Sequence, residues 1–599
     1  MRIIFCIVIL WIGMVLSIPI GGKPALRRSV VVSQPDGSTL CVVRTGNAHC
    51  NDVFTEDGYL LQYDETLGYV YAEVDRDASL TASGVVAHDA HCRKVDEMEY
   101  LKGYDADAIS EALAYKYQEY ERGLTVSGAT RGMGLYSDAF PRKGEQKGLV
   151  ILAEFQDVKF NSKTREDSKV DTYSYFHDML NKPGFDMFGS NGSARDWFVE
   201  NSGGIFIPTF DVFGPIELSN TMEYYGSNNA AGMDRRGADM VIEACKKLDA
   251  EIDFSEYDRD GDGYVDNVYI FYAGLGEADS NESDSLWPCN WTLTQAGKRP
   301  FTLDGVRIDR FAYSNETYDD LRRPDGIGTF VHEFSHVLGL PDLYPTATYS
   351  SKRDTPLTPW EYSVMDYGSY NDNGLTPPNY SAYERYALDW LVPSEIEEGE
   401  NEIENIEESN RAIILRTSKD SEYYLLENRQ LKGWDKALPA AGMLAWHVDY
   451  VPLVFSGNKV NNDKQHQHVE LVKANGATDG RHNTLQYLKG FPFPGSSNTV
   501  SFGYATIPSL RQWDGASLGV ELSGIRIEDG IVRFSAEISE SSGITSIDAD
   551  DHDMETGAAE VEVYDLSGRR WQMKDISSVP GLYIIREGSS VRKIVITMK

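Results

Sequence analysis

Two histidines and a glutamate in the second half of the chain have the spacing of a metal site. His332, Glu333 and His336 form an H-E-x-x-H arrangement. Because residues i and i+4 lie on one face of a helix, the two imidazoles can bind one metal ion. Two such ligands and a third protein group leave one position for water, as a catalytic zinc requires. Glu333 is suitably placed to take a proton from that water.

The residues that follow the second histidine predict the third ligand. Gly339 allows the backbone to turn sharply after the helix, and Asp342 can then return to the metal. A carboxylate is an accepted zinc ligand. The alternative is that Asp342 is a loop carboxylate that follows Pro341. We predict a zinc site formed by His332, His336 and Asp342.

Downstream, Ser363-Val-Met-Asp-Tyr367 fits the Met-turn that lies beneath the zinc in metzincins. Met365 would pack below the site and would not bind the metal. Tyr367 is a candidate to stabilise the oxyanion of the tetrahedral intermediate. The alternative is that both residues belong to the hydrophobic core.

A second candidate metal site is an aspartate-rich loop. Alternating side chains offer oxygens to one centre, and oxygen is the ligand that calcium prefers. The loop lacks the glutamate at position twelve of an EF-hand, because Tyr269 stands there. We therefore predict a calcium loop outside an EF-hand, although an acidic solvated turn is the alternative. Its ligands would be Asp258, Asp260, Asp262, Tyr264 through its carbonyl, and Asp266.

These motifs resemble the immune inhibitor A family of secreted zinc metallopeptidases, within the metzincin-like group. The strongest match lies in 330–344 and 362–370, and weaker matches extend it over roughly 30–535. The resemblance implies endopeptidase activity on proteins, a propeptide and bound calcium. Cys289 stands where the family leads us to expect a histidine, and its pairing with Cys245 is then an option.

The composition restricts the class of protein. The chain has 599 residues, 41% of them hydrophobic and 25% charged, and a formal net charge of −37. This balance is typical of a folded protein with several structural units. The large negative charge argues against nucleic-acid binding, which needs a basic face. We expect a monomer that acts on protein or peptide substrates.

The N-terminus predicts export. A basic residue precedes an apolar run from Ile3 to Leu16, and small residues follow, as in a signal peptide. The next unit resembles the family's propeptide, and a group that plugs the open position of the zinc would keep the enzyme latent. Cys92 and Cys50 are candidates because a thiolate binds zinc well, and an aspartate or glutamate would also serve.

Changes in pattern divide the chain into six parts. Strands and helices alternate around the H-E-x-x-H motif, whereas short strands dominate on either side, so we predict an α+β (α/β-like) peptidase domain between β-rich units. The acidic stretch Ser394–Ser409 is predicted as a linker. The parts are a signal peptide (1–22), a β-rich propeptide-like domain (23–135), the catalytic domain (140–393), a β-sandwich (410–540), a flexible linker (541–558) and a small β-module (559–599).

The C-terminal module resembles the sorting domain that is read by the type IX secretion system of Bacteroidetes. The likeness rests on Tyr564-Asp-Leu-Ser-Gly-Arg569, Gly581-Leu-Tyr583 and the end around Lys593. An ordinary β-module is the alternative. If the likeness holds, secretion machinery is a partner, and the protein is extracellular or attached to the cell surface.

The sequence thus predicts a secreted zinc endopeptidase that is made as a latent precursor. Glu333 would be the general base, with Tyr367 as a possible second catalytic residue. The rival hypothesis is a catalytically inert, calcium-stabilised adhesin on a peptidase scaffold.

Overall fold

The computed structural model contains six β-sheets and short helices, a mixed α and β architecture as the sequence predicted. The structure describes residues 21–26, 29–48, 51–75, 79–113, 135, 140–161, 170–229, 233–280, 283–318, 324–347, 349 and 352–539, and the C-terminal strands named below. The predicted signal peptide, apart from Gly21 and Gly22, lies outside this part of the chain.

A six-stranded sheet forms the base of the predicted catalytic domain. Its order is β1-β11-β14-β10-β8-β9, and β11 is antiparallel to β14 whereas β8, β9, β10 and β14 run parallel. Pro208 lies within β9 without breaking it, because β9 is an edge strand that tolerates a missing N–H donor. The strands are β1 (Gly21–Gly22), β8 (Gly144–Glu154), β9 (Phe206–Glu217), β10 (Val268–Leu275), β11 (Cys289–Thr292) and β14 (Arg310–Thr317).

Helices cover both faces of this sheet. In β10, Tyr269 and Phe271 pack with α8, whereas Val268 and Ile270 pack with α6. This alternation is the period-two pattern of a strand. The helices of this region are α3 (Thr172–Asn181), α4 (Ala194–Asn201), α5 (Met222–Gly226), α6 (Gly237–Lys247), α7 (Glu277–Ser280), α8 (Gly328–Val337) and α9 (Ala382–Ala387), and a small hairpin is formed by β12 (Phe301–Leu303) and β13 (Val306–Ile308).

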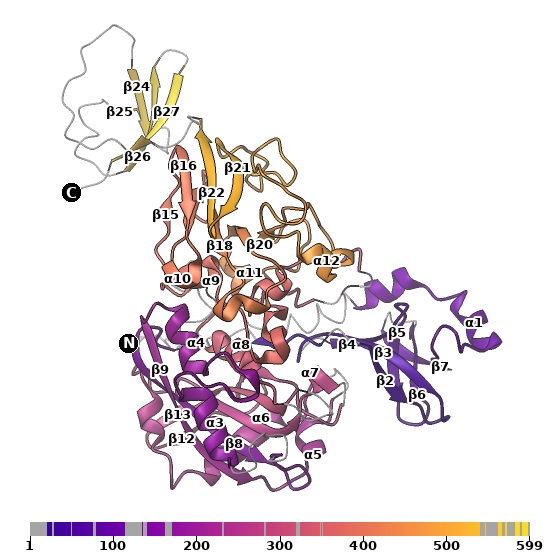
Figure 1. Ribbon diagram of the computed structural model, residues 1–599. Helices are drawn as coiled ribbons and strands as arrows, with labels where there is room; N and C mark the ends of the chain where they lie inside the picture. The colour runs from indigo at the N-terminus through magenta and orange to yellow at the C-terminus, as the bar shows by residue number, and fades with distance from the viewer. Residues whose placement is uncertain are drawn as a thin grey trace, which may run out of the picture.

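The N-terminal region is a separate antiparallel sheet, drawn in indigo to one side of the catalytic region (Figure 1). Its six strands follow one another in chain order, and α1 (Val95–Leu101) comes after the last of them. The strands are β2 (Ser29–Ser33), β3 (Thr39–Gly46), β4 (Asn51–Thr55), β5 (Leu60–Asp64), β6 (Gly68–Val74) and β7 (Leu80–Val86).

Two further sheets follow the catalytic region, and they share one hydrophobic core. Leu426 and Ala445 on the five-stranded sheet pack with Val532 and Phe534 on the three-stranded sheet. The sheets are β15 (Ser394–Glu395), β17 (Ile413–Arg416), β18 (Glu422–Arg429), β19 (Gly442–Asp449) and β20 (Val469–Val472), and β16 (Gly399–Ile403), β21 (Val520–Glu528) and β22 (Ile531–Ile538). Three short helices complete the region: α10 (Ile406–Ser409), α11 (Pro452–Ser456) and α12 (Leu485–Leu488).

The predicted linker Ser394–Ser409 is therefore wrong. This stretch supplies β15, β16 and α10. In β16, Asn401 and Ile403 are buried, whereas the alternating Glu400 and Glu402 are exposed, so the strand has an acidic face and a core-facing side. The high density of charge on one face masked the period-two pattern.

The last sheet consists of β23 (Thr545–Ser546), β24 (Val561–Asp565), β25 (Arg570–Trp571), β26 (Gly581–Glu587) and β27 (Ser590–Ile596). β23 lies within the range predicted as a linker and pairs in parallel with β27. Among the described residues, no helix is long and apolar enough to cross a membrane.

Candidate metal centre and active-site cleft

The three predicted zinc ligands converge in the buried interior. Oδ1 of Asp342 lies 3.4 Å from Nε2 of His332 and 3.1 Å from Nε2 of His336, and all three side chains are fully buried. Zinc bonds of about 2.0–2.2 Å in a tetrahedral arrangement would separate neighbouring ligand atoms by roughly 3.3 Å. The spacing of these atoms therefore fits a zinc ion.

The orientation of both imidazoles also fits a metal site. Nδ1 of His332 donates to the carbonyl of Val364 at 2.7 Å, and Nδ1 of His336 donates to the carbonyl of Leu340 at 2.8 Å. A proton on each Nδ1 leaves the lone pair of Nε2 for a metal ion. The backbone thus fixes the tautomer that metal binding requires.

Gly339 performs the turn that the sequence predicted. Its φ of +103° is strained for any residue with a side chain, and it brings the chain back after α8 ends at Val337. Asn458, from the region after β19, then holds the returning aspartate: its Nδ2 donates to Oδ2 of Asp342 at 2.7 Å, and its Oδ1 accepts from the Asp342 amide at 2.8 Å. This bidentate contact leaves Oδ1 of Asp342 facing the histidines. No sequence pattern points to Asn458, which lies 116 residues from Asp342.

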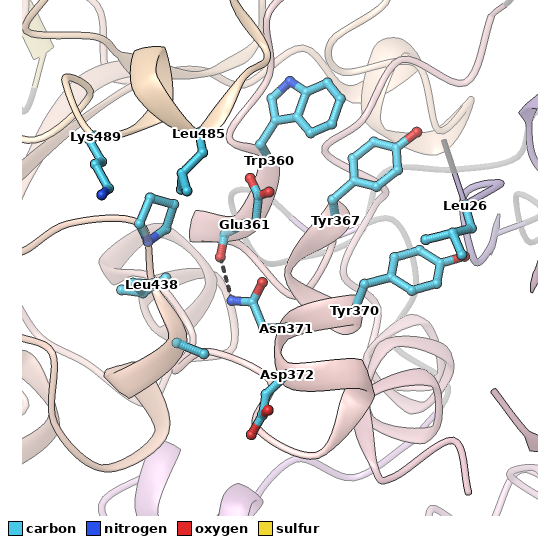
Figure 2. Close-up of a pocket in the computed structure, with 12 residues that line it drawn as sticks. Leu26, Trp360, Glu361, Tyr367, Tyr370, Asn371, Asp372, Leu438, Leu485 and Lys489 are labelled. Atoms are coloured by element: carbon cyan, nitrogen blue, oxygen red, sulfur yellow. Dashed lines mark hydrogen bonds between the residues drawn. The ribbon is translucent and has the colours of Figure 1, made fainter. Parts of the chain in front are cut away.

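Met365 and Tyr367 have different surroundings. Met365 is fully buried, and its carbonyl accepts from the amide of Leu343, so its loop braces the segment beside Asp342. Tyr367 stacks on Trp360 with ring centroids 4.4 Å apart and lines a pocket with Tyr370 (Figure 2). Tyr367 is therefore placed on the wall of a pocket beside the cleft.

Glu333 is fully buried beside the triad. Burial raises the pKa of Glu333 to about 7, and the charge of Asp342 adds to this, against the opposing effect of His332. A general base whose pKa is near the working pH is well suited to proton transfer in both directions.

The chain's own N-terminal segment lies directly over this site. β1 pairs antiparallel with β11, so that Gly21 faces Asn290 and Gly22 faces Cys289. A Cβ on Gly21 would lie 2.5 Å from Nε2 of His336, so only glycine allows the backbone to approach the site this closely. Local sequence patterns carry no signal for this segment, because its partners in β11 lie more than 250 residues away.

The contacts of this segment follow the backbone residue by residue. The amide of Lys23 donates to Oε1 of Glu333 at 2.7 Å, and the hydroxyl of Tyr344 donates to the carbonyl of Gly22. The carbonyl of Lys23 accepts from Nε1 of Trp287 at 2.8 Å. The carbonyl of Pro24 accepts from the hydroxyl of Tyr370 at 2.6 Å. Tyr344 stands two residues after Asp342, so the motif itself could have drawn attention to it.

The cysteines take no part in the metal site within the described residues. Cys92, proposed as a latency residue, is exposed on the N-terminal unit, whereas the triad is buried. Cys50 lies outside the described part of the chain. The option of a Cys245–Cys289 disulfide is wrong, because both thiols are free and buried. Cys289 instead begins the strand that receives Gly22.

The aspartate-rich loop brings carboxylates together as predicted. One oxygen each of Asp258, Asp260 and Asp262 lies within 4.8 Å of the others. Oδ1 of Asp258 is buried and makes no hydrogen bond to the described residues. Burial, together with the charges of Asp260 and Asp262, raises the pKa of Asp266 to about 8. Two oxygens of Asp266 accept from the amide of Arg259 at 3.2 Å, and Tyr264 lies in the same turn.

A buried His-His-Asp triad with an adjacent glutamate has the residue types of a metallopeptidase site. Residues 138–392 match the family model described as Immune inhibitor A peptidase M6, catalytic domain. Residues 138–392 are thus similar to a peptidase M6 catalytic domain, and this match supports a metalloprotease function.

Two curated relatives agree with the domain match. The chain is 28% identical over 239 residues to Immune inhibitor A of Bacillus thuringiensis subsp. alesti. This alignment covers 34% of each of the two chains. It is 28% identical over 240 residues to Pre-pro-metalloprotease PrtV of Vibrio cholerae serotype O1, which covers 34% of this chain and 26% of PrtV. The match thus spans about a third or less of each relative's length.

Proposed function

We propose that this protein is a secreted zinc endopeptidase with a metzincin-like catalytic domain, made as a latent precursor. The observation that carries the proposal is the convergence of His332, His336 and Asp342 beside Glu333, with an extended peptide across them. Zinc bound there would polarise a peptide carbonyl and lower the pKa of a bound water.

The N-terminal segment supports the proposed role of Glu333, because its backbone lies across the site as a bound peptide substrate would. In peptide hydrolysis the general base passes its proton to the leaving amine. The amide that contacts Glu333 is that of Lys23. The Gly22–Lys23 bond therefore corresponds to the bond that is cleaved, with Gly22 on the acyl side and Lys23 on the amine side.

The same register favours Tyr344 over Tyr367 as the residue that stabilises the oxyanion. The Tyr344 hydroxyl donates to the carbonyl of Gly22, which would carry the developing negative charge. Asn47 donates to this hydroxyl at 3.1 Å. Asn47 belongs to the N-terminal unit, so the contact would be lost once that unit leaves.

We expect Tyr344→Phe to lower kcat by about 10²–10³-fold, because one oxyanion donor is removed. Tyr367→Phe is the matched control and should lower it far less. Initial rates of peptide hydrolysis, measured at saturating substrate with zinc content verified, compare the two variants. A larger loss in Tyr367→Phe would return the role to Tyr367.

Latency is attributed to the N-terminal segment, in place of the cysteines. Its backbone covers the site, and buried contacts anchor the unit behind it. Arg44 of β3 forms a buried ion pair with Glu277, whose carboxylate also accepts from Asn228 at 2.7 Å. The amide of Leu26 donates to the carbonyl of Ala278 at 2.9 Å. Peptide substrates cannot enter while this segment is in place.

The test of the proposed function uses the purified full chain before and after limited proteolysis. We expect the intact chain to leave casein undigested and the processed chain to digest it. A zinc chelator should abolish digestion, and added zinc should restore it. Digestion that persists in zinc-free protein would contradict the proposal. Absence of all digestion by the processed, zinc-loaded chain would instead favour the inert-adhesin hypothesis.

Calcium in the aspartate loop is a further part of the proposal. Asp258, Asp260 and Asp262, the Tyr264 carbonyl and Asp266 would supply oxygen ligands. The support is the crowding of carboxylates around a buried, unbonded oxygen of Asp258. A cation would offset their mutual repulsion.

Removal of calcium with EGTA should lower the melting temperature by about 5–10 °C, as expected for loss of a ligand present at about a hundred times its Kd. Asp260→Asn should melt at the lower temperature with or without calcium, whereas the exposed Asp249→Asn should behave like the unaltered protein. Differential scanning calorimetry provides the measurement. Equal melting temperatures with calcium and EGTA would exclude the site.

Export and sorting remain proposals that rest on the two ends of the sequence. The apolar run from Ile3 to Leu16 supports a signal peptide. Because Gly21 and Gly22 pair with β11 in the proposed precursor, this signal peptide would end before Gly21 and not at residue 22 as the sequence predicted. The β23–β27 sheet supports a folded C-terminal module of the kind that secretion machinery can recognise.

A further inference from the structure

The side chain of Lys23 fills a closed acidic pocket beside the metal centre. Its Nζ lies 3.0 Å and 3.2 Å from the two oxygens of Asp279 and 3.4 Å from Oδ2 of Asp325. The ammonium is 4.3 Å from the centroid of the Tyr370 ring, an arrangement that favours a cation. The lysine side chain is fully buried.

The pocket is built from rigid elements. Asp279 lies in α7, and its Oδ2 also accepts from Nδ2 of Asn315 in β14 at 3.1 Å. Asp325 precedes α8 and accepts from the hydroxyl of Thr329 in the first turn of that helix. These contacts fix both carboxylates in place before any side chain enters.

The charges in the pocket are suited to one kind of side chain. Burial lowers the pKa of Lys23, but the charges of Asp279 and Asp325 outweigh this and raise it above the ordinary value, so the lysine is a cation. An uncharged side chain would leave two buried carboxylates without a counter-charge, which is strongly unfavourable.

The position of the lysine relates the pocket to the reaction. Lys23 is the residue whose amide contacts Glu333, and it therefore corresponds to the residue directly after the cleaved bond. Beyond it, the Pro24 carbonyl accepts from Tyr370, and Leu26 lies beside that tyrosine at the open pocket (Figure 2). The segment thus leaves the metal centre along the path of the amine-side half of a substrate.

We propose that Asp279, Asp325 and Tyr370 form the S1′ subsite of the peptidase and that this subsite selects lysine in protein substrates. The inference rests on the proposed endopeptidase function. The precursor would use the same subsite to hold its own Lys23, so that substrate preference and latency depend on one pocket.

The test begins with the P1′ profile of the processed enzyme. Denatured casein is digested, and the new N-termini are identified by mass spectrometry. We expect lysine to be the most enriched residue directly after the cleaved bonds. The bond that is cut fastest is then synthesised as two peptides that carry lysine or the uncharged norleucine at P1′. The lysine peptide should have a kcat/KM about 100-fold or more above that of the norleucine peptide.

The variants assign that preference to the pocket. In Asp279→Asn/Asp325→Asn the ratio of the two kcat/KM values should fall to about one, because the lysine peptide loses its two counter-charges. The exposed Asp249→Asn should keep the full ratio. If the double variant does not fold, the unaltered enzyme's ratio for the two peptides still decides whether P1′ lysine is preferred.

The outcomes separate the two proposals. Absence of any casein digestion by the zinc-loaded, processed protein would contradict the proposed function itself. Digestion without P1′ lysine enrichment, or equal hydrolysis of the two peptides, would overturn the subsite while leaving the peptidase intact. If the preference for lysine at P1′ persists in the double variant, residues other than Asp279 and Asp325 produce that preference.

Discussion

Replacement of Glu333 by alanine is expected to abolish hydrolysis while zinc stays bound. Glu333 is buried beside the triad and contacts the backbone amide at the position of the leaving amine. It is not one of the three groups whose atoms converge at the metal centre. Loss of a positioned general base should reduce kcat by at least about 10²–10⁴-fold.

Casein digestion by the processed protein and its zinc content by atomic absorption test this expectation together. Glu145→Gln, a change at an exposed position of β8, is the matched control and should keep full activity. Efficient casein cleavage by zinc-loaded Glu333→Ala would falsify the proposed role. Loss of zinc in the same variant would instead assign Glu333 to the metal shell.

The second large effect is expected from Asp342→Asn. Oδ1 of this residue lies 3.1 Å and 3.4 Å from the two histidine nitrogens, at the spacing of zinc ligands. A neutral amide is a weaker ligand, so zinc affinity should fall by more than about 100-fold and activity should fall with it. Asn458→Ala removes only the group that orients Asp342, and it should cost about 10–100-fold in affinity.

Competition with a calibrated zinc chelator measures both affinities. Asp249→Asn is the control for an aspartate that is remote from the site. Unchanged zinc affinity in Asp342→Asn would show that the third ligand is another group. An equal loss of zinc affinity in Asp342→Asn and Asn458→Ala would mean that the contribution of Asp342 to zinc affinity depends wholly on its contact with Asn458.

In the proposed mechanism, the pocket around Lys23 would serve both inhibition of the precursor and substrate preference of the processed enzyme. The segment runs antiparallel to β11, as an extended substrate can, and its lysine satisfies two buried carboxylates. In the proposed mechanism, removal of the segment would uncover the metal centre and would also expose the subsite to the lysine side chains of protein substrates. Inhibition and specificity therefore draw on the same contacts.

The sequence by itself determined the features that depend on local geometry. The i, i+4 spacing of His332 and His336, the turn at Gly339 and the alternating aspartates are fixed by residues close together in the chain. The linker prediction at Ser394–Ser409 was wrong because surface charge concealed the buried face of β16.

Only the tertiary structure decided what faces the metal centre from a distance. Lys23 reaches Glu333 across 310 residues, and Asn458 reaches Asp342 across 116. The sequence pointed to Tyr367, whereas the contact between the Tyr344 hydroxyl and the Gly22 carbonyl is the basis on which Tyr344 is proposed. Such contacts depend on how sheets and loops pack, and local spacing carries no information about packing between segments this far apart. The sequence therefore defined the reacting groups, and the fold decided what they meet.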